Sequence, residues 1–254
     1  MSFVFAVVAA VALAGGAAAA EPESNCTVPD SLIATDVVLS RAAAEIKDRH
    51  RLDITVVGSG SSALAGPDGA RFAYPAQLEQ ALKERLPGNE IKVTAHVQPK
   101  LTTADMASGL PRILTEDKPA LVIWQAGTVD SLRGVEPDDF RISLDHGLDA
   151  IAKAQAEAIL MNMQFSPRTE TMLSVTPYAD VMRWVTEQRG IPLFDRLAIM
   201  HYWSDEGTFD LYAATNSYAM ARKVHECLGR ALAMQIMNAA HLDAGTPANV
   251  ESNK

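Results

Sequence analysis

Short apolar runs alternate with longer segments of helical periodicity from Asp53 onward, and this alternation limits the chain to very few folds. Several runs are almost entirely apolar, which is typical of parallel strands that helices cover on both faces. We therefore predict five strands in a mainly parallel sheet. Their predicted ranges are Ile54–Val57, Ile91–Val97, Ala120–Gln125, Ala158–Met163 and Pro192–Phe194.

The segments between these runs have the spacing of amphipathic helices, and turn residues such as Gly88 and Gly190 close them. The predicted helices are Ser40–Arg49, Tyr74–Leu86, Thr102–Leu114, Asp138–Ala156, Glu170–Gln188 and Ala213–Ala240. Strands that alternate with helices predict a three-layer α/β/α sandwich of the flavodoxin-like kind, with right-handed crossovers.

The first twenty residues carry no charged side chain and end in a run of alanines. This pattern predicts a secretory signal peptide over residues 1–20, but the usual basic start is missing, so either the true start lies upstream or the signal is unusually plain. We expect a periplasmic or secreted protein with no membrane span in the mature chain. A single domain is expected over residues 21–241, followed by a flexible tail over 242–254, because no repeat or linker divides the chain.

The formal net charge of −9 disfavours nucleic acid as a partner, because binding to phosphates depends mainly on basic side chains. The two cysteines, Cys26 and Cys227, are expected to form a disulfide, since an even pair is usually bridged in an oxidising compartment. Neither cysteine has a metal-ligand neighbour at a useful spacing, so no metal site is predicted.

A tract rich in glycine and serine follows the first predicted strand. It reads Gly58-Ser59-Gly60-Ser61-Ser62 and continues to Gly66. Open α/β sheets bind their ligands at such a βα turn, and a strained turn can expose a nucleophilic hydroxyl there. The same composition also suits a flexible turn without chemistry.

Two stretches of the chain resemble blocks I and III of the SGNH/GDSL hydrolases. They are Gly60–Gly66, with Tyr74 and Pro75 opening the next helix, and Pro119–Asp130. In layout the resemblance covers about the whole mature chain, and it is closest to exported, divergent bacterial members. It implies the SGNH-hydrolase fold and a monomer that takes a small-molecule or glycan ester and needs no cofactor.

The family's Gly-Asp-Ser motif fits the tract in two ways. Alignment on Gly66 makes Ser62 the nucleophile and puts Ser61 in place of the Asp. Alignment on the strand end makes Gly58 the first residue and leaves Gly60, which has no side chain, in place of the nucleophile. We prefer Ser62 and keep Ser61 and Ser59 as further candidates, because strand ends are uncertain from sequence alone.

The resemblance also implies donors for the oxyanion of the reaction. The glycine of the family's second block is missing, so the backbone N–H of Leu101 would replace it. Val129 stands where the third block has an asparagine donor, and Thr128 or Gln125 would have to substitute. Asp130 is interpreted as a structural anchor. The candidate oxyanion and substrate-binding residues are Gly60, Leu101, Gly127 and Thr128.

The family's fifth block supplies Asp-x-x-His as orienting acid and general base. Asp205 fits the acid, but Thr208 stands where the histidine belongs. His201 is the nearby imidazole, and a serine needs such a base to become nucleophilic. His201 could equally be a loop residue without a catalytic part, and a carboxylate could serve as a weaker base.

Two functions follow from this sequence. The first is an exported serine esterase or acyl hydrolase, possibly acting on an envelope glycan, in which Ser62 attacks and His201 with Asp205 moves the proton. The second is a binding or scaffold protein of the cell envelope that keeps the cleft without the chemistry.

Overall fold

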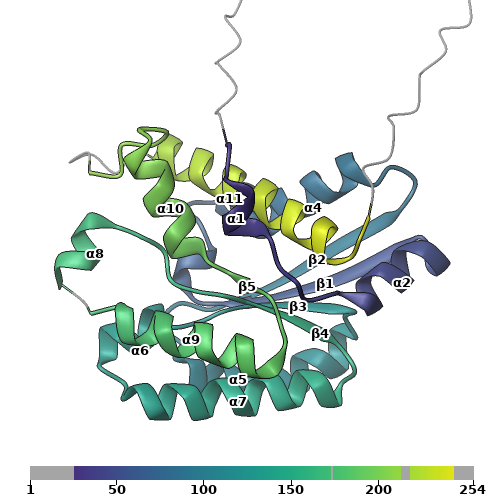
Figure 1. Ribbon diagram of the computed structural model, residues 1–254, viewed down its shortest axis with the longest axis horizontal. Helices are drawn as coiled ribbons and strands as arrows, with labels where there is room; N and C mark the ends of the chain where they lie inside the picture. Colours follow the sequence, from purple (N-terminus) through teal and green to yellow (C-terminus); the bar gives the residue numbers. More distant parts are fainter. Residues whose placement is uncertain (1–25, 173, 213–217, 243–254) are drawn as a thin grey trace, which may run out of the picture.

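The computed structural model describes residues 26–172, 174–212 and 218–242 (Figure 1). The predicted signal peptide, nearly all of the predicted tail and the first residues of the predicted final helix lie outside the described residues. Within the described part of the chain, no helix has both the length and the apolarity to cross a membrane.

The sheet has five parallel strands in the order β2-β1-β3-β4-β5. The strands are β1 (Arg51–Gly58), β2 (Glu90–Val97), β3 (Leu121–Gln125), β4 (Glu157–Met161) and β5 (Leu193–Phe194). The predicted five-stranded flavodoxin-like sheet is therefore confirmed. The strand order reverses between β1 and β3, and ligands of such sheets bind beyond the carboxyl ends of the strands at this point.

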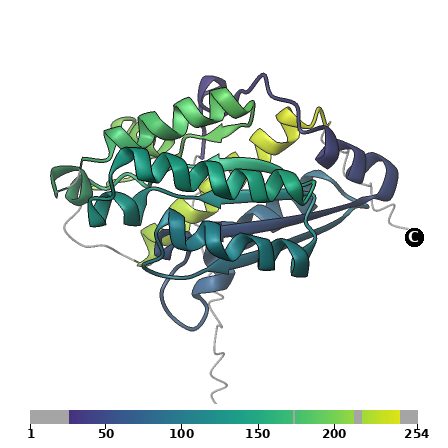
Figure 2. The same ribbon diagram turned by 90° about the horizontal axis from the view of Figure 1, so that it is seen from below.

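Helices cover both faces of the sheet (Figure 1 and Figure 2). Each face has its own apolar core. One layer contains α1 (Asp30–Ile33), α2 (Ser40–Arg49), α4 (Tyr74–Arg85), α10 (Arg196–Asp205) and α11 (Tyr218–Ala239). The other contains α5 (Thr103–Asp117), α7 (Pro137–Lys153) and α9 (Thr176–Arg189). Shorter helices join them: η1 (Gly60–Ser62), α3 (Gly69–Phe72), α6 (Thr128–Arg133) and α8 (Pro167–Met172).

Two helical regions differ from the sequence prediction. The helix expected from Glu170 is divided into α8 and α9, and α9 starts with Pro177 in its first turn, where proline is well tolerated. The segment with His201 and Asp205 is the helix α10 rather than a loop. The Asp195 side chain starts this helix by accepting a hydrogen bond from the N–H of Ala198, at 3.0 Å.

A disulfide joins Cys26 to Cys227, as the sequence predicts. It links the segment ahead of α1 to the middle of α11, across 201 residues of chain. The pairing therefore fastens the N-terminal arm to the helix that also carries His225.

A matched pair of glycine substitutions tests the packing that holds β3 in place. A Cβ at Gly147 on α7 would overlap the ring of Trp124, which is fully buried on β3, whereas a Cβ at Gly109 on α5 meets nothing. We expect Gly147→Ala to lower the free energy of unfolding by about 1–3 kcal/mol through overpacking. Gly109→Ala should raise it by about 0.5–1 kcal/mol, because alanine favours a helix. Urea unfolding measures both, and equal effects would contradict this packing.

Candidate active site

A cleft of about 620 Å³ opens at the point where the strand order reverses. The serine tract after β1 forms one wall, and the start of α6 after β3 forms another. The cleft-lining residues used below are Ser59, Gly60, Ser61, Thr128, Gln164 and His225. Its position is the one that the fold predicts for a ligand.

The tract turns sharply where β1 ends. The parallel ladder with β2 runs as far as the pair Gly58 and Val97, and Ser59 then continues as extended chain. The helix η1 follows, with the N–H of Ser62 donating to the carbonyl of Ser59 at 2.9 Å. Because of this turn, the side chains of Ser59, Ser61 and Ser62 lie in different surroundings.

The Gln125 side chain, at the end of β3, binds two of the three serines. Its Oε1 accepts hydrogen bonds from the N–H and Oγ of Ser59, both at 3.1 Å, and from Oγ of Ser62 at 3.2 Å. Its Nε2 donates to Oγ1 of Thr128 at 3.3 Å. The amide is fully buried, so these contacts fix the end of β1 against the end of β3.

The side chains of Ser62 and Ser61 differ in exposure and in the space that each one lines. Ser62 is 1% exposed, and its Oγ also lies 3.1 Å from the Tyr74 hydroxyl. It lines a neighbouring cavity of about 530 Å³ and is not among the lining residues of the cleft. Ser61 is half-buried and lines the cleft, where its Oγ lies 3.5 Å from Nη1 of Arg196. Of the three hydroxyls, that of Ser61 has the weakest contact within the protein.

Arg196, the first residue of α10, is buried close to the tract and was not anticipated from the sequence. Its Nη2 donates to Oε1 of Gln164 at 2.9 Å, and burial lowers its pKa to about 10. The signal that could have found it is its place just after β5, because the carboxyl ends of parallel strands share one edge of the sheet.

His225, on α11, lines the cleft and is not among the candidates taken from the sequence. Its Nδ1 accepts a hydrogen bond from the backbone N–H of Tyr74 at 3.0 Å. Burial, with a smaller contribution from the Arg196 charge, lowers its pKa to about 3. The imidazole is therefore neutral at neutral pH with its proton on Nε2, so it is a hydrogen-bond donor toward the cleft. No motif in the sequence indicated this contact.

The predicted base and orienting acid lie on α10. Nε2 of His201 is 3.3 Å from Oε1 of Glu170, and its ring packs on Phe165 with centroids 3.8 Å apart. Asp205 is exposed near the end of α10. Within the described ranges, no hydrogen bond or ion pair joins either residue to a serine of the tract.

The candidate oxyanion donors are only partly brought together. Gly60 and Thr128 line the cleft, whereas Leu101 and Gly127 are not among its lining residues. Gly127 has φ +90° and starts α6, where a side chain would overlap Met163. Asp130 accepts hydrogen bonds from the N–H and Oγ1 of Thr103, at 3.0 and 2.8 Å, which is the structural role that the sequence predicts.

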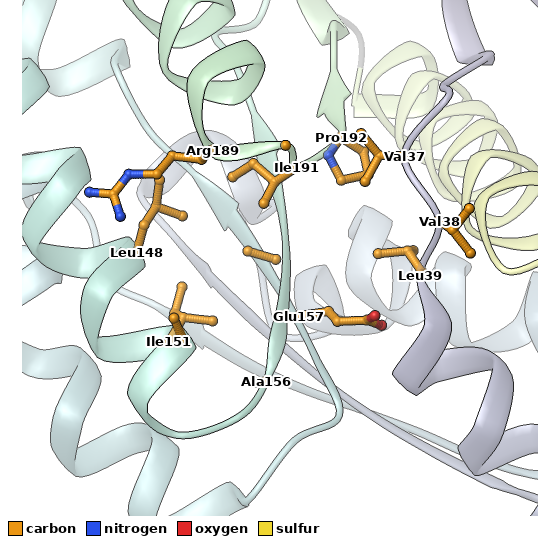
Figure 3. A pocket seen from close by; sticks show the side chains of 13 residues that line it. Val37, Val38, Leu39, Leu148, Ile151, Ala156, Glu157, Arg189, Ile191 and Pro192 are labelled. Atoms are coloured by element: carbon orange, nitrogen blue, oxygen red, sulfur yellow. The ribbon is translucent and has the colours of Figure 1, made fainter.

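A smaller apolar cavity of about 270 Å³ lies at the opposite edge of the sheet, where β4 and β5 begin (Figure 3). Both charged side chains at its rim have protein partners. Glu157 accepts hydrogen bonds from the start of α2, and Arg189 binds Asp145 and Asp149. This cavity shares no residue with the cleft. Among the described residues there is no group of three or more metal-ligating side chains.

Comparisons with known proteins agree with this architecture. Residues 25–242 match the sequence model of the non-GDSL lipase-like family. Esterase TesA of Pseudomonas aeruginosa is 30% identical over 114 residues, which cover 45% of this chain and 55% of TesA. The matched segment thus spans about half the length of that curated relative.

Solved structures share the fold at lower identity. A crystal structure of TesA has a TM-score of 0.58 at 23% identity and covers 72% of this chain and 99% of its own. The lipase/acylhydrolase from Enterococcus faecalis has a TM-score of 0.62 at 18% identity, with coverage of 77% and 99%. A catalytic mutant of Axe2, an acetylxylan esterase from Geobacillus stearothermophilus, has a TM-score of 0.58 at 18% identity, with coverage of 73% and 94%.

Replacing Gln125 tests its role at the joint between β1 and β3. Gln125→Met keeps the volume but leaves the buried N–H of Ser59 without its acceptor. An unsatisfied buried group costs about 1–3 kcal/mol, so we expect a loss of at least about 2 kcal/mol for this variant. Gln80→Met on the exposed face of α4 should change stability by less than about 0.5 kcal/mol. Chemical denaturation compares them, and a loss for Gln125→Met no larger than its control would refute the assignment.

The low pKa of the buried His225 predicts the direction in which the stability of the protein changes with pH. Since its pKa is about 3 in the folded protein and about 6.5 in the unfolded chain, only the unfolded state binds the proton between these values. Stability should therefore fall as the pH drops below 6.5, by up to about 1.4 kcal/mol per unit from this residue. His225→Gln should reduce that fall, and the exposed control His241→Gln should not. Unfolding at pH 7 and pH 4.5 measures the difference, and parallel profiles for all three proteins would contradict a neutral buried imidazole.

Proposed function

The chain belongs to the non-GDSL lipase-like family, and we propose that it binds an acyl ligand in its esterase-type cleft without cleaving it. The observation that carries this proposal is the end of β1 at Gly58. It supports the strand-end alignment of the family motif, in which Gly60 takes the position of the nucleophile. Gly60 lines the cleft and has no hydroxyl to offer.

Two further positions of the family motifs support binding without hydrolysis. Val129 replaces the asparagine donor, and Thr208 stands in place of the catalytic histidine. The segment 213–217 reads Ala-Ala-Thr-Asn-Ser and brings neither an imidazole nor a carboxylate. A serine hydroxyl without a base of suitable pKa is a poor nucleophile.

His225 does not supply the missing base. Its Nδ1 is occupied by the N–H of Tyr74, and its Nε2 carries the proton. Because a base must accept a proton, His225 instead donates a hydrogen bond to a carbonyl or carboxylate oxygen in the cleft. Its role is recognition.

Hydrolysis through Ser61 is the second candidate, and one observation favours it. The Ser61 hydroxyl lines the cleft with the Arg196 guanidinium 3.5 Å away, and that charge would stabilise a developing oxyanion. Ser62, the serine preferred from sequence, and Ser59 would first have to release their bonds to Gln125.

We also infer that the protein works outside the cytoplasm as a monomeric single domain. The disulfide supports an oxidising compartment, since such bonds rarely persist in a reducing one. The uncharged, alanine-rich start of the sequence agrees with export.

Labelling with a fluorophosphonate probe tests the proposal. The purified, disulfide-intact protein should remain unlabelled at pH 7.5, because among the described residues no imidazole or carboxylate is hydrogen-bonded to a serine of the tract. A known serine hydrolase in the same tube confirms that the probe is active, and near-UV circular dichroism confirms that the protein is folded.

If the wild type is labelled, two serine variants identify the hydroxyl that reacts with the probe. Labelling of the wild type that disappears in Ser61→Ala identifies Ser61 as an activated nucleophile and supports hydrolysis through it. Labelling that disappears in Ser62→Ala supports the nucleophile predicted from sequence. Either result overturns the proposal of binding without cleavage.

A further inference from the structure

Arg196 is a buried cation for which the described residues provide no counter-charge. It is 1% exposed, and no carboxylate of the described chain lies within 4.0 Å of it. Its guanidinium contacts the Gln164 amide and the Ser61 hydroxyl, and its buried Nε has no hydrogen-bond partner among the described residues. The titratable groups that its charge also acts on are the Tyr74 phenol and the His225 imidazole, and neither is an anion at neutral pH. Arg189, by contrast, binds two aspartates on the surface.

An isolated buried charge is costly, and proteins normally pair it. Here the adjacent Asp195 does not do so, because its carboxylate caps α10, accepts from Asn162 and lies 3.5 Å from Arg183. The described residues thus give this desolvated guanidinium no anionic partner.

The space beside Arg196 has the shape and chemistry for such an anion. A cavity of about 310 Å³ is lined by Arg196, Gln164 and His225 and by apolar side chains that include Phe165, Met200 and Val224. Gln164 and His225 also line the main cleft, so the two spaces adjoin. One side is polar with a single positive charge, and apart from Ser166 the other lining residues are apolar.

We propose that this cavity binds the carboxylate of a short or medium-chain acyl acid, with Arg196 as its counter-charge and the Nε2–H of His225 as a second donor. The apolar side chains surround the acyl chain. A single positive charge matches a monoanion, whereas a phosphate dianion would leave negative charge in an apolar site. This inference rests on the proposed function and gives its ligand class.

Calorimetric titration of the disulfide-intact protein with sodium octanoate tests the site, with octanamide as the uncharged ligand of similar shape. The wild type should bind octanoate at least about tenfold more tightly than octanamide, since hydrogen bonds to a charged partner are the stronger kind. Arg196→Met should weaken octanoate binding at least about tenfold and remove the preference for the acid. Arg112→Met, on the exposed face of α5 and among the lining residues of neither space, should leave both affinities within about twofold of the wild type, because an exposed charge adds little.

A second variant, Arg196→Lys, keeps the positive charge but lacks the planar guanidinium with its paired N–H donors. It replaces Arg196→Met in the experiment if that variant does not fold. It should bind octanoate more weakly than the wild type and still prefer it to octanamide. Equal binding of acid and amide by the wild type, unchanged octanoate binding in a folded Arg196 variant, or no binding of any acid from butanoate to decanoate overturns the inference.

These outcomes are separate from the labelling experiment. A protein that is unlabelled and binds no acid contradicts the carboxylate site alone. A labelled protein contradicts the proposed function, and the affinity comparison still decides whether Arg196 recognises a carboxylate.

Discussion

The site depends on the hydrogen bonds that the buried side-chain amide of Gln125 makes with Ser59 and Ser62. It joins the turn after β1 to the end of β3, the two strands between which the order of the sheet reverses. One oxygen accepts from Ser59 and Ser62, so both hydroxyls contribute to structure. Two serines of a tract that suggests serine chemistry in the sequence are thus polar anchors in the fold, and Gly60 and Ser61 line the cleft.

Burial determines the chemistry of the remaining polar groups. Desolvation keeps His225 neutral, and the N–H of Tyr74 fixes which of its nitrogens carries the proton. The Arg196 charge nearby adds to the same shift. Together they give the cleft a hydrogen-bond donor and the adjoining cavity a positive charge. For this reason we propose recognition of acyl groups and acids rather than nucleophilic attack.

The sequence predicted the architecture well because apolar runs and turn residues report directly on strands and helices. The strands, the helix Ser40–Arg49 and the pairing of Cys26 with Cys227 agree with the structure. The site was harder to predict, because its contacts join residues far apart in the chain. His225 meets Tyr74 across 151 residues, and Arg196 approaches Ser61 across 135. Helix α10 was missed because the family motif led us to expect a loop there.

The central claim is that no hydroxyl of the serine tract is activated for attack. Intact-mass measurement during incubation with p-nitrophenyl octanoate tests it most directly, because an acyl-enzyme adds one octanoyl group to the protein. The account predicts that the mass stays that of the unmodified chain throughout. A transient octanoyl adduct that peptide mapping assigns to Ser59, Ser61 or Ser62 would contradict it.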